Sequence, residues 1–318
     1  MNTGILSIFT RSPLHVGAGA SVGTVDQPVI RERATGYPVI PGSSLKGVLA
    51  DLFMKEGEDV CKLDRKDREG KIIGHDYVRI KGGRAWRLFG DNSNKNGEAF
   101  AGALLVGEAK LLAFPVRSAR GGFAWITSPF ALRRFARDNN KWTFTVPDIN
   151  QGHAVVSGQS EVIIGNHAVL EEFSLEVGKD SIPTDILRAV ESLSDDITWK
   201  SVGRRLVILS EDEFSYFVRN NCEIAQHNRI DDGKGVVDDG ALFNQENVPS
   251  ETLFYAIINA SDSRQTDRES TDAKPPVKPP LDVLADELSS QSVGNLLQIG
   301  ADITTGLGWC SVNFSING

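Results

Sequence analysis

Both ends of the chain are predicted strands, and this constrains the fold more than any other feature. Residues 4–10 are rich in Ile, Leu and Phe, and residues 309–316 alternate apolar with polar side chains. Between them lie predicted strands at residues 103–114, 122–126, 154–156, 162–164 and 253–259, and predicted helices at residues 45–55, 129–137, 183–193 and 281–291. Mixing strands and helices in this way predicts an α+β fold with long insertions.

Export and membrane insertion are not indicated by this sequence. Its opening residues lack a basic lead and a cleavage site, and no apolar run approaches the ~20 residues needed to span a bilayer. Cys61, Cys222 and Cys310 are far apart and odd in number, which argues against a disulfide framework or a cysteine-built zinc site. We therefore expect a cytoplasmic protein without a membrane partner.

Charge is distributed unevenly along the chain, whose formal net charge is −8. Residues 1–141 carry 22 Lys and Arg against 14 Asp and Glu, whereas residues 142–318 carry 12 against 28. The asymmetry predicts one basic face that suits a polyanion. Two ordinary solvated faces are the alternative interpretation.

Glycines follow the first predicted strand but do not form a dinucleotide-binding loop. Gly17, Gly19 and Gly23 miss the GxGxxG spacing because residue 22 is Val. Prolines also interrupt the following twenty residues, so a loop is expected there instead of a helix.

Residues 41–47 (PGSSLKG) place two hydroxyls and a lysine where a helix is predicted to begin. Ser43 or Ser44 can cap that helix, as Ser128 with Pro129 can start the helix at residues 129–137. Backbone N–H groups at such a start, with Lys46, suit an anionic backbone. An ordinary capped helix with a surface lysine remains an equal alternative.

Two residues near the first strand are candidates for chemistry. His15 ends the strand beside the glycines, where it is either a general base or a structural histidine. Asp26 lies in a loop followed by Arg31 and Arg33, and loops near basic regions often carry functional carboxylates. Its alternative role is that of an Asx-turn residue.

Several sequence blocks occur in one order along nearly the whole chain. They are LHVGAG at residues 14–19, VDQPVIRE at 25–32, GYPVIPGSSLKG at 36–47, WRLFG at 86–90, LLAFPVRS at 111–118, FAWITSP at 123–129, ID at 230–231 with GALF at 240–243, and LQIGADITTGLG at 297–308. Together they resemble the RAMP superfamily, and within it the family of the fourth subunit of Cmr (type III-B) CRISPR complexes. Ala301 and Leu307 depart from the family's usual glycine and basic residue.

The resemblance implies a single domain, residues 1–318, with an RRM/ferredoxin-like core and a protruding β-hairpin thumb. Its implied partners are a CRISPR guide RNA, a single-stranded target RNA, copies of the same chain in a helical filament, and other subunits of the Cmr complex. The target RNA would be cut at regular intervals where thumbs interrupt its pairing with the guide.

Three insertions interrupt this core. Residues 56–87 form a charged loop, basic from residue 62 onward, which either faces RNA or is merely solvated. Residues 218–248 form the thumb, with extended stretches at 218–230 and 236–243 around an Asp-Gly turn. Its apolar flanks predict a wedge that unstacks a base step, and an ordinary surface hairpin is the alternative. Residues 261–280, which carry four prolines, are expected to be disordered or a surface loop.

The family's cleavage-associated carboxylate corresponds to Asp26, with His15 and Glu246 as secondary catalytic candidates. A 2′-hydroxyl of the target attacks the adjacent phosphate and leaves a 2′,3′-cyclic phosphate and a 5′-hydroxyl. An ordinary aspartate is a poor base for a hydroxyl. We therefore expect Asp26 to position the hydroxyl or to bind a divalent metal, Mg²⁺ or Mn²⁺. Expected RNA-binding residues are Gly17, Gly19, Arg31, Ser43, Ser44, Lys46, Arg229, Gly300, Thr304, Thr305 and Gly306.

Three other functions remain open. A non-catalytic filament subunit would share the RNA-binding features and lack a productive Asp26. A guide-processing RAMP endoribonuclease would favour a site centred on histidine. The related Csm-type backbone subunit would perform the same chemistry in another complex, although the blocks at residues 111–118 and 123–129 favour the Cmr type.

Overall fold

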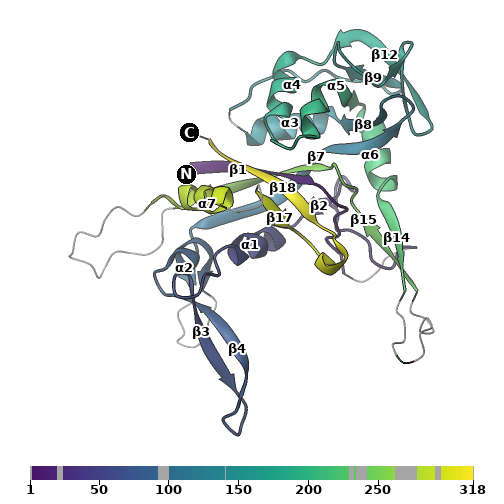
Figure 1. Ribbon diagram of the computed structural model, residues 1–318. Helices are drawn as coiled ribbons and strands as arrows, with labels where there is room; N and C mark the ends of the chain where they lie inside the picture. Colours follow the sequence, from purple (N-terminus) through teal and green to yellow (C-terminus); the bar gives the residue numbers. More distant parts are fainter. Residues whose placement is uncertain are drawn as a thin grey trace.

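Four antiparallel strands of a 12-stranded sheet form the centre of the protein (Figure 1). The computed structural model describes residues 2–19, 24–91, 100–139, 141–228, 233, 242–261, 278–290 and 295–317. The central strands, in spatial order, are β7 (Leu104–Ser118), β16 (Leu253–Ala260), β1 (Asn2–Thr10) and β18 (Trp309–Asn317). Two short strands extend this sheet: β2 (Val39–Ile40) pairs with β7, and β17 (Leu296–Gln298) pairs with β18.

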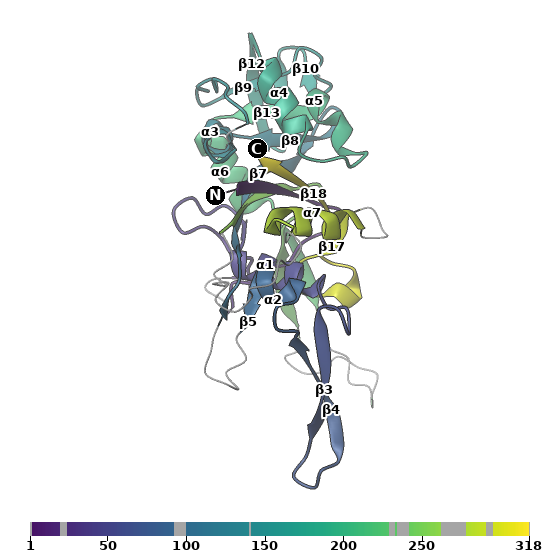
Figure 2. The ribbon, with the colours of Figure 1, turned by 90° about the vertical axis from the view of Figure 1, so that its left-hand side faces the viewer.

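Two helices cover one face of this sheet. Helix α1 (Gly42–Asp51) lies between β1 and β7 in the chain, and α7 (Pro280–Ser290) lies between β16 and β18. Figure 2 shows both on the same side of the strands. The succession β–α–β–β–α–β, with β1 paired between β16 and β18, is the ferredoxin-like arrangement. The predicted α+β class and core are therefore confirmed.

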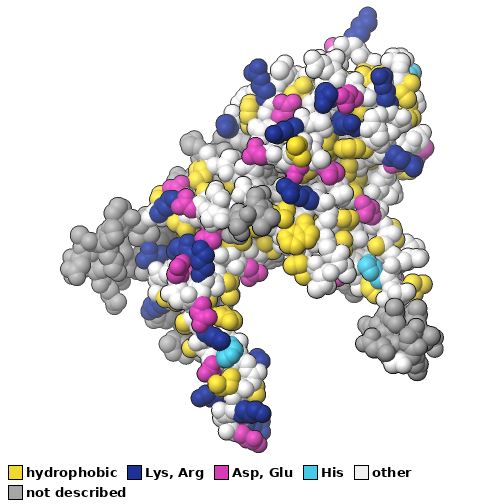
Figure 3. All heavy atoms as spheres, viewed as in Figure 1, with side chains coloured by type: hydrophobic (Ala, Val, Ile, Leu, Met, Phe, Trp, Pro, Cys, Tyr) yellow, Lys and Arg dark blue, Asp and Glu magenta, His cyan; other side chains and the backbone are white. Residues whose placement is uncertain are grey.

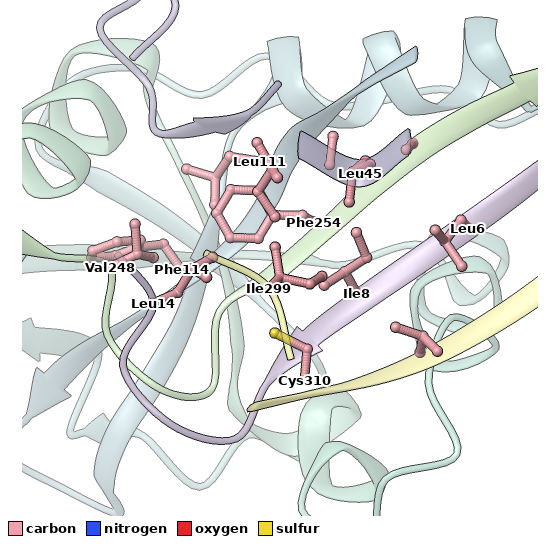
Figure 4. Close-up of a cluster of buried hydrophobic side chains, with 14 of the residues drawn as sticks. Leu6, Ile8, Leu14, Leu45, Leu111, Phe114, Val248, Phe254, Ile299 and Cys310 are labelled. Carbon is pink, nitrogen blue, oxygen red and sulfur yellow. The ribbon is translucent and has the colours of Figure 1, made fainter. Parts of the chain in front are cut away.

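Side chains of β1 alternate between two hydrophobic clusters, so both faces of the sheet are buried. Leu6 and Ile8 join the cluster beneath α1 and α7, part of which Figure 4 shows. Ile5 and Phe9 join the opposite cluster, where the Phe9 and Trp199 rings lie 5.2 Å apart. Burial on both faces explains why this strand is a nearly continuous apolar run in the sequence.

A second lobe is inserted between β7 and β16 and lies at the top of Figures 1 and 2. Its elements are β8 (Gly122–Thr127), α3 (Pro129–Asp138), β9 (His153–Val156), β10 (Ile163–Ile164), β11 (His167–Leu170), β12 (Phe173–Ser181), α4 (Thr184–Glu191), η2 (Trp199–Ser201), α5 (Val202–Arg205), β13 (Leu206–Leu209) and α6 (Glu211–Asn220). Strand β7 continues into this lobe and pairs with β8. The sheet then curls back, because Leu170 of β11 pairs with Ser118 of β7.

Two hairpins project from the body on the side away from the second lobe. One consists of β3 (Val60–Lys66) and β4 (Ile72–Arg79), followed by α2 (Arg84–Phe89) and the small ladder of β5 (Gly90–Asp91) with β6 (Phe100–Ala101). The other consists of β14 (Glu223–His227) and β15 (Phe243–Asn247). The space-filling view in Figure 3 shows the molecule hollowed between the two hairpins.

The charged segment predicted as a loop at residues 56–87 is mostly this ordered first hairpin. Its turn is closed by the side chain of Asp67, whose Oδ1 accepts the backbone N–H groups of Glu69 and Lys71 at 2.9 Å each. Charged residues alternate poorly with apolar ones here, so the hydrophobic pattern did not reveal the strands.

Of the two predicted helix starts, the one at Ser128 is confirmed and the one at Ser43 or Ser44 is wrong. Ser128 caps α3 as expected, because its hydroxyl accepts the N–H of Ala131 at 3.2 Å and Pro129 occupies the first turn. The prediction that Ser43 or Ser44 caps a helix at residues 45–55 was wrong. Helix α1 begins at Gly42, earlier than predicted, with Pro41 at the cap position and no side-chain cap.

The extended stretch predicted from residue 218 was also wrong at its beginning. Helix α6 runs to Asn220, because Ser210 accepts the N–H of Glu213 at 3.3 Å and Phe214, Phe217 and Val218 are buried at helical spacing. The extended chain begins only at β14. Residues 229–232 and 234–241 of the predicted thumb, Arg229 included, lie outside the described residues, as does most of the predicted loop at residues 261–280.

Helices in the described part of the chain are all too short or too polar to cross a bilayer. Cys222 and Cys310 are buried free thiols, and Cys61 is an exposed one.

We predict that the cluster beneath α1 and α7 carries much of the stability. Phe254 on β16 is fully buried there, so Phe254→Ala should lower the free energy of unfolding by about 3–5 kcal/mol in urea titrations. Ile197→Ala is the control, because that side chain is 82% exposed and should change the midpoint little. Equal midpoints for the two variants would contradict the proposed core.

Candidate functional site

Strand β15 is the element around which the candidate site is built. Four consecutive polar residues form its end, and Gln245, Glu246 and Asn247 are buried. The loop at residues 24–31 runs along this strand. Its Gln27 N–H donates to the carbonyl of Asn244 at 3.0 Å, and the Glu246 N–H donates to the carbonyl of Gln27 at 2.9 Å. The loop is therefore paired with the base of the projecting hairpin.

Asp26 stands exposed at the edge of this pairing. Its Oδ2 accepts the backbone N–H of Asn244 at 2.8 Å, while Oδ1 has no partner among the described residues. An Asx turn would bond the carboxylate within its own loop, whereas this bond spans 218 positions of sequence. The carboxylate is thus fixed through one oxygen and open at the other.

Glu246 fastens the same loop from below. One carboxylate oxygen accepts the N–H of Val29 at 3.0 Å, and the other pairs with the guanidinium of Arg31 at 2.5 Å. The side chain is buried, and both of its oxygens are occupied. A direct catalytic role for Glu246 stays a prediction that these contacts do not favour, because they assign it to holding the loop.

Arg31 is turned inward instead of toward a ligand. Its guanidinium also donates to the carbonyls of Gly36 and Val218 at 2.9 and 2.8 Å and to the Cys222 sulfur at 3.3 Å. Burial raises the pKa of the Cys222 thiol to about 12, although Arg31 acts in the opposite direction. Glu246 is therefore the anionic partner of Arg31, and the expected contact of Arg31 with RNA remains without support here.

His15 lies buried against the other side of β15. Its Nδ1 is 2.7 Å from the carbonyl oxygen of Glu246, which can only accept, so Nδ1 carries a hydrogen. In the neutral ring Nε2 is then an acceptor. A Cβ at residue 17 would lie 3.0 Å from Nε2, so Gly17 keeps this nitrogen uncovered. Gly17 and Gly19 themselves are exposed.

The glycine-rich loop before β18 packs onto the same strand end. Ala301 donates its N–H to the carbonyl of His15 at 2.9 Å, and the Gln245 amide donates to the Asp302 carboxylate at 2.8 Å. Gly300 has a φ of 86°, and a Cβ there would lie 2.2 Å from the carbonyl oxygen of His15, so only glycine fits.

This glycine-rich loop is anchored from within and exposed at its tip. Figure 4 shows Ile299 in the core with Leu14 and Val248. The predicted RNA-binding residues Thr304, Thr305 and Gly306 lie exposed at and just after the short helix η3 (Ile303–Thr305). The tip therefore presents hydroxyls and backbone groups on an anchored base.

The first turn of α1 forms a separate group. Ser43 is exposed and Ser44 and Lys46 are half-buried, and Lys46 has no ion-pair partner among the described residues. The described residues show no hydrogen bond between this turn and the loop that carries Asp26. The structure thus brings Asp26, His15, Glu246, Arg31 and the glycine-rich loop together around β15, and leaves the α1 turn apart.

A metal site made by protein ligands alone is not present in the described part of the chain, where no three His, Cys, Asp or Glu side chains converge. Asp26 is a lone carboxylate with one available oxygen. Mg²⁺ is often held by one or two carboxylates together with phosphate oxygens and water. The residues present therefore fit a cation that binds together with RNA.

Sequence reasoning missed the residues that position Asp26. Asn244 supplies the N–H, Gln245 bonds to the glycine-rich loop, and Val218 and Cys222 receive Arg31. A usable signal was the run Asn-Gln-Glu-Asn after Phe243, because buried polar residues in a strand need specific partners.

We predict that Arg31 acts on stability and not on RNA contact. Breaking its largely buried pair with Glu246 by Arg31→Gln should lower the free energy of unfolding by about 3 kcal/mol. Arg33→Gln, in the same loop but exposed, is the matched control and should have little effect. Urea unfolding checks this, and the double variant with Glu246→Gln should be less than additive. A stable Arg31→Gln chain with a reduced salt dependence of RNA binding would reverse the assignment.

Comparisons with known proteins agree with this geometry. The model of the RAMP superfamily matches residues 8–311. The CRISPR system Cmr endoribonuclease Cmr4 of Pyrococcus furiosus is 33% identical over 319 residues, covering 98% of this chain and 95% of that protein. The Cms endoribonuclease Csm3 of Mycobacterium tuberculosis is 35% identical over only 123 residues, 37% of this chain and 45% of that protein.

Solved structures show the same fold. The crystal structure of oligomeric Cmr4 from Pyrococcus furiosus matches with a TM-score of 0.68 and 28% identity, covering 100% of this chain and 99% of that one. A type III-B Cmr-beta complex bound to cognate target RNA contains a chain with a TM-score of 0.65 at 20% identity, which covers 98% of this chain and 96% of that one. The chain therefore belongs to the RAMP superfamily and, within it, to the family of the Pyrococcus furiosus endoribonuclease Cmr4.

Proposed function

We propose that this chain is a guide-RNA-binding backbone subunit of a type III-B CRISPR complex and an endoribonuclease that cuts guide-bound target RNA at regular intervals. Similarity to Cmr4 over nearly the full length of both proteins supports the assignment. The observation that carries it is Asp26, an exposed carboxylate held through one oxygen at the base of a projecting hairpin.

The cleavage step uses the open oxygen of Asp26. Oδ1 accepts the hydrogen of a target 2′-hydroxyl and orients that oxygen toward the adjacent phosphorus, while Oδ2 stays bonded to Asn244. The 2′-oxygen loses its proton to water and forms the new bond to phosphorus, and the bond from phosphorus to the 5′-oxygen breaks. The leaving 5′-oxygen takes a proton from water, giving a 2′,3′-cyclic phosphate and a 5′-hydroxyl. The neighbouring hairpin holds the strand, so that nucleophile and leaving group lie in line.

A divalent cation, Mg²⁺ or Mn²⁺, belongs to this proposal. As the alternative to bonding the hydroxyl, Oδ1 of Asp26 would hold this cation together with RNA phosphate oxygens, and the cation would neutralise charge that develops on the phosphate. The single available carboxylate of the described site supports binding that depends on RNA. The protein's own residues orient the 2′-hydroxyl and position the RNA strand.

RNA lies in the hollow between the two hairpins. Gly17, Gly19 and the exposed tip at Thr304, Thr305 and Gly306 border the cleavage site with small side chains, hydroxyls and backbone groups. The first turn of α1 adds Ser43, Ser44 and Lys46 as contacts to the phosphate backbone.

Assembly in the cytoplasm with copies of itself and other Cmr subunits completes the proposal. A relative was solved as oligomeric Cmr4, which supports the filament of like chains. A Csm-type subunit is disfavoured because the similarity to the Csm3 protein of Mycobacterium tuberculosis covers 37% of this chain. A guide-processing enzyme is disfavoured because His15, the histidine of this site, is buried and bonded through Nδ1.

We predict that Asp26→Asn and Asp26→Ala both stop target cleavage by the assembled complex and leave guide binding intact. Asparagine keeps an oxygen that accepts the Asn244 N–H but loses the negative charge, whereas alanine loses both. Comparing the two variants therefore separates the effect on the position of the loop from the effect on the chemical step. The rate should fall roughly 10²–10⁴-fold in single-turnover assays with labelled target RNA. Wild-type rates in both variants would contradict the assignment of Asp26 to cleavage.

Lys46→Ala should weaken RNA binding regardless of sequence. Loss of one phosphate contact lowers the slope of log affinity against log salt by about 0.7 on single strands. Lys200→Ala, an exposed lysine on the second lobe, is the matched control. Filter-binding titrations at several salt concentrations measure both slopes, and identical slopes for the two variants would leave Lys46 a plain surface residue.

A further inference from the structure

The hairpin of β3 and β4 stands without a covering element in the described part of the chain. Only Val60, at its foot, is buried in β3, and residues 61–66 are all exposed. A two-stranded hairpin on its own is marginally stable in water, and packing against another element would stabilise it. Figures 1 and 2 show it extending well beyond the body.

Strand register sorts its side chains onto two faces. Lys62 pairs with Tyr77, and Asp64 pairs with His75, which places these four side chains on one face. Lys66 follows two residues after Asp64 on the same strand, beyond a register shift between Arg65 and Lys66 that places it opposite Ile72. These five residues, Lys62, Asp64, Lys66, His75 and Tyr77, are called the basic–aromatic face.

The opposite face has a different chemistry. It carries the pairs Cys61 with Val78, Leu63 with Asp76, and Arg65 with Gly74. Its single basic side chain is balanced by one acid, and its remaining side chains are apolar or absent.

The unpaired lysines and the exposed tyrosine ring of the basic–aromatic face favour binding of a polyanion whose bases are accessible. Lys62 and Lys66 have no ion-pair partner among the described residues, whereas the acid Asp64 is bonded to His75 at 2.9 Å. Tyr77 is 51% exposed beside Lys62. Lysines that bind phosphates next to a ring that stacks on bases are the recurring features of proteins that bind single strands.

We propose that the basic–aromatic face binds a single-stranded stretch of RNA, with Lys62 and Lys66 on phosphates and Tyr77 stacked on a base. The inference rests on the proposed function and adds a contact about which the similarity to known proteins says nothing. The location agrees, because this hairpin borders the hollow in Figure 3, opposite the hairpin that positions Asp26.

Binding by the complete complex tests this contact. The double variant Lys62→Gln with Lys66→Gln should lower the salt slope of RNA binding by about 1.4, which is two phosphate contacts. Tyr77→Ala should weaken binding by about 5- to 150-fold, whereas Tyr77→Phe should keep the wild-type affinity. Arg65→Gln, on the opposite face of the same strand, is the control and should leave the slope unchanged.

Cross-linking identifies which RNA is bound. Guide RNA and target RNA carry 4-thiouridine in separate experiments, and a cross-link to the peptide that contains Tyr77 is expected with one of them. Unchanged binding by the Lys62/Lys66 and Tyr77 variants, with no cross-link to this peptide, would overturn the inference. So would loss of self-association with RNA contacts intact, because the face would then bind another copy of the chain.

The inference and the proposed function can fail separately. A wild-type complex that binds no RNA would refute both. A wild-type complex that binds and cuts RNA, together with hairpin variants that behave like Arg65→Gln, would refute the hairpin contact alone.

Discussion

The buried carboxylate of Glu246 is the interaction on which the candidate site depends. The side chain of Glu246 bonds the N–H of Val29 and the guanidinium of Arg31 to strand β15. The backbone carbonyl of the same residue accepts a hydrogen bond from His15. A loop bounded by glycine and proline has little structure of its own, so these bonds supply its conformation. Asp26 is placed by the loop that Glu246 fastens, and a buried charged group of this kind tolerates the loss of its partner poorly.

One consequence is that the carboxylate and the hairpin behave as a unit. Asp26 is bonded to Asn244 in β15, and β15 is one strand of the projecting hairpin. Any RNA strand held by that hairpin therefore meets the carboxylate in a fixed relation. The proposed cleavage by a neighbouring hydroxyl needs in-line geometry more than strong acid–base chemistry, and this fixed relation is what the fold would contribute to it.

Prediction from sequence worked where local pattern and local energetics coincide. The terminal strands, α7 and the Ser128 cap of α3 follow from side-chain alternation and from one hydroxyl near its own helix. It failed for β3 and β4, whose charged residues hide the strand period, and for the end of α6, where Val218 was assigned to an extended run. The predicted cap at Ser43 also failed, because helix α1 begins earlier and Pro41 occupies the cap position.

The sequence by itself determined the α+β class, the order of the family's blocks and the choice of Asp26 as the leading carboxylate. Only the tertiary structure shows that Arg31 and Glu246, which had been predicted to bind RNA and to take part in catalysis, are bonded to each other. Their bond spans 215 positions, and no local pattern reports a partner at that distance. The physical reason is burial of this pair, because a guanidinium and a carboxylate that bond to each other inside the protein do not face a ligand.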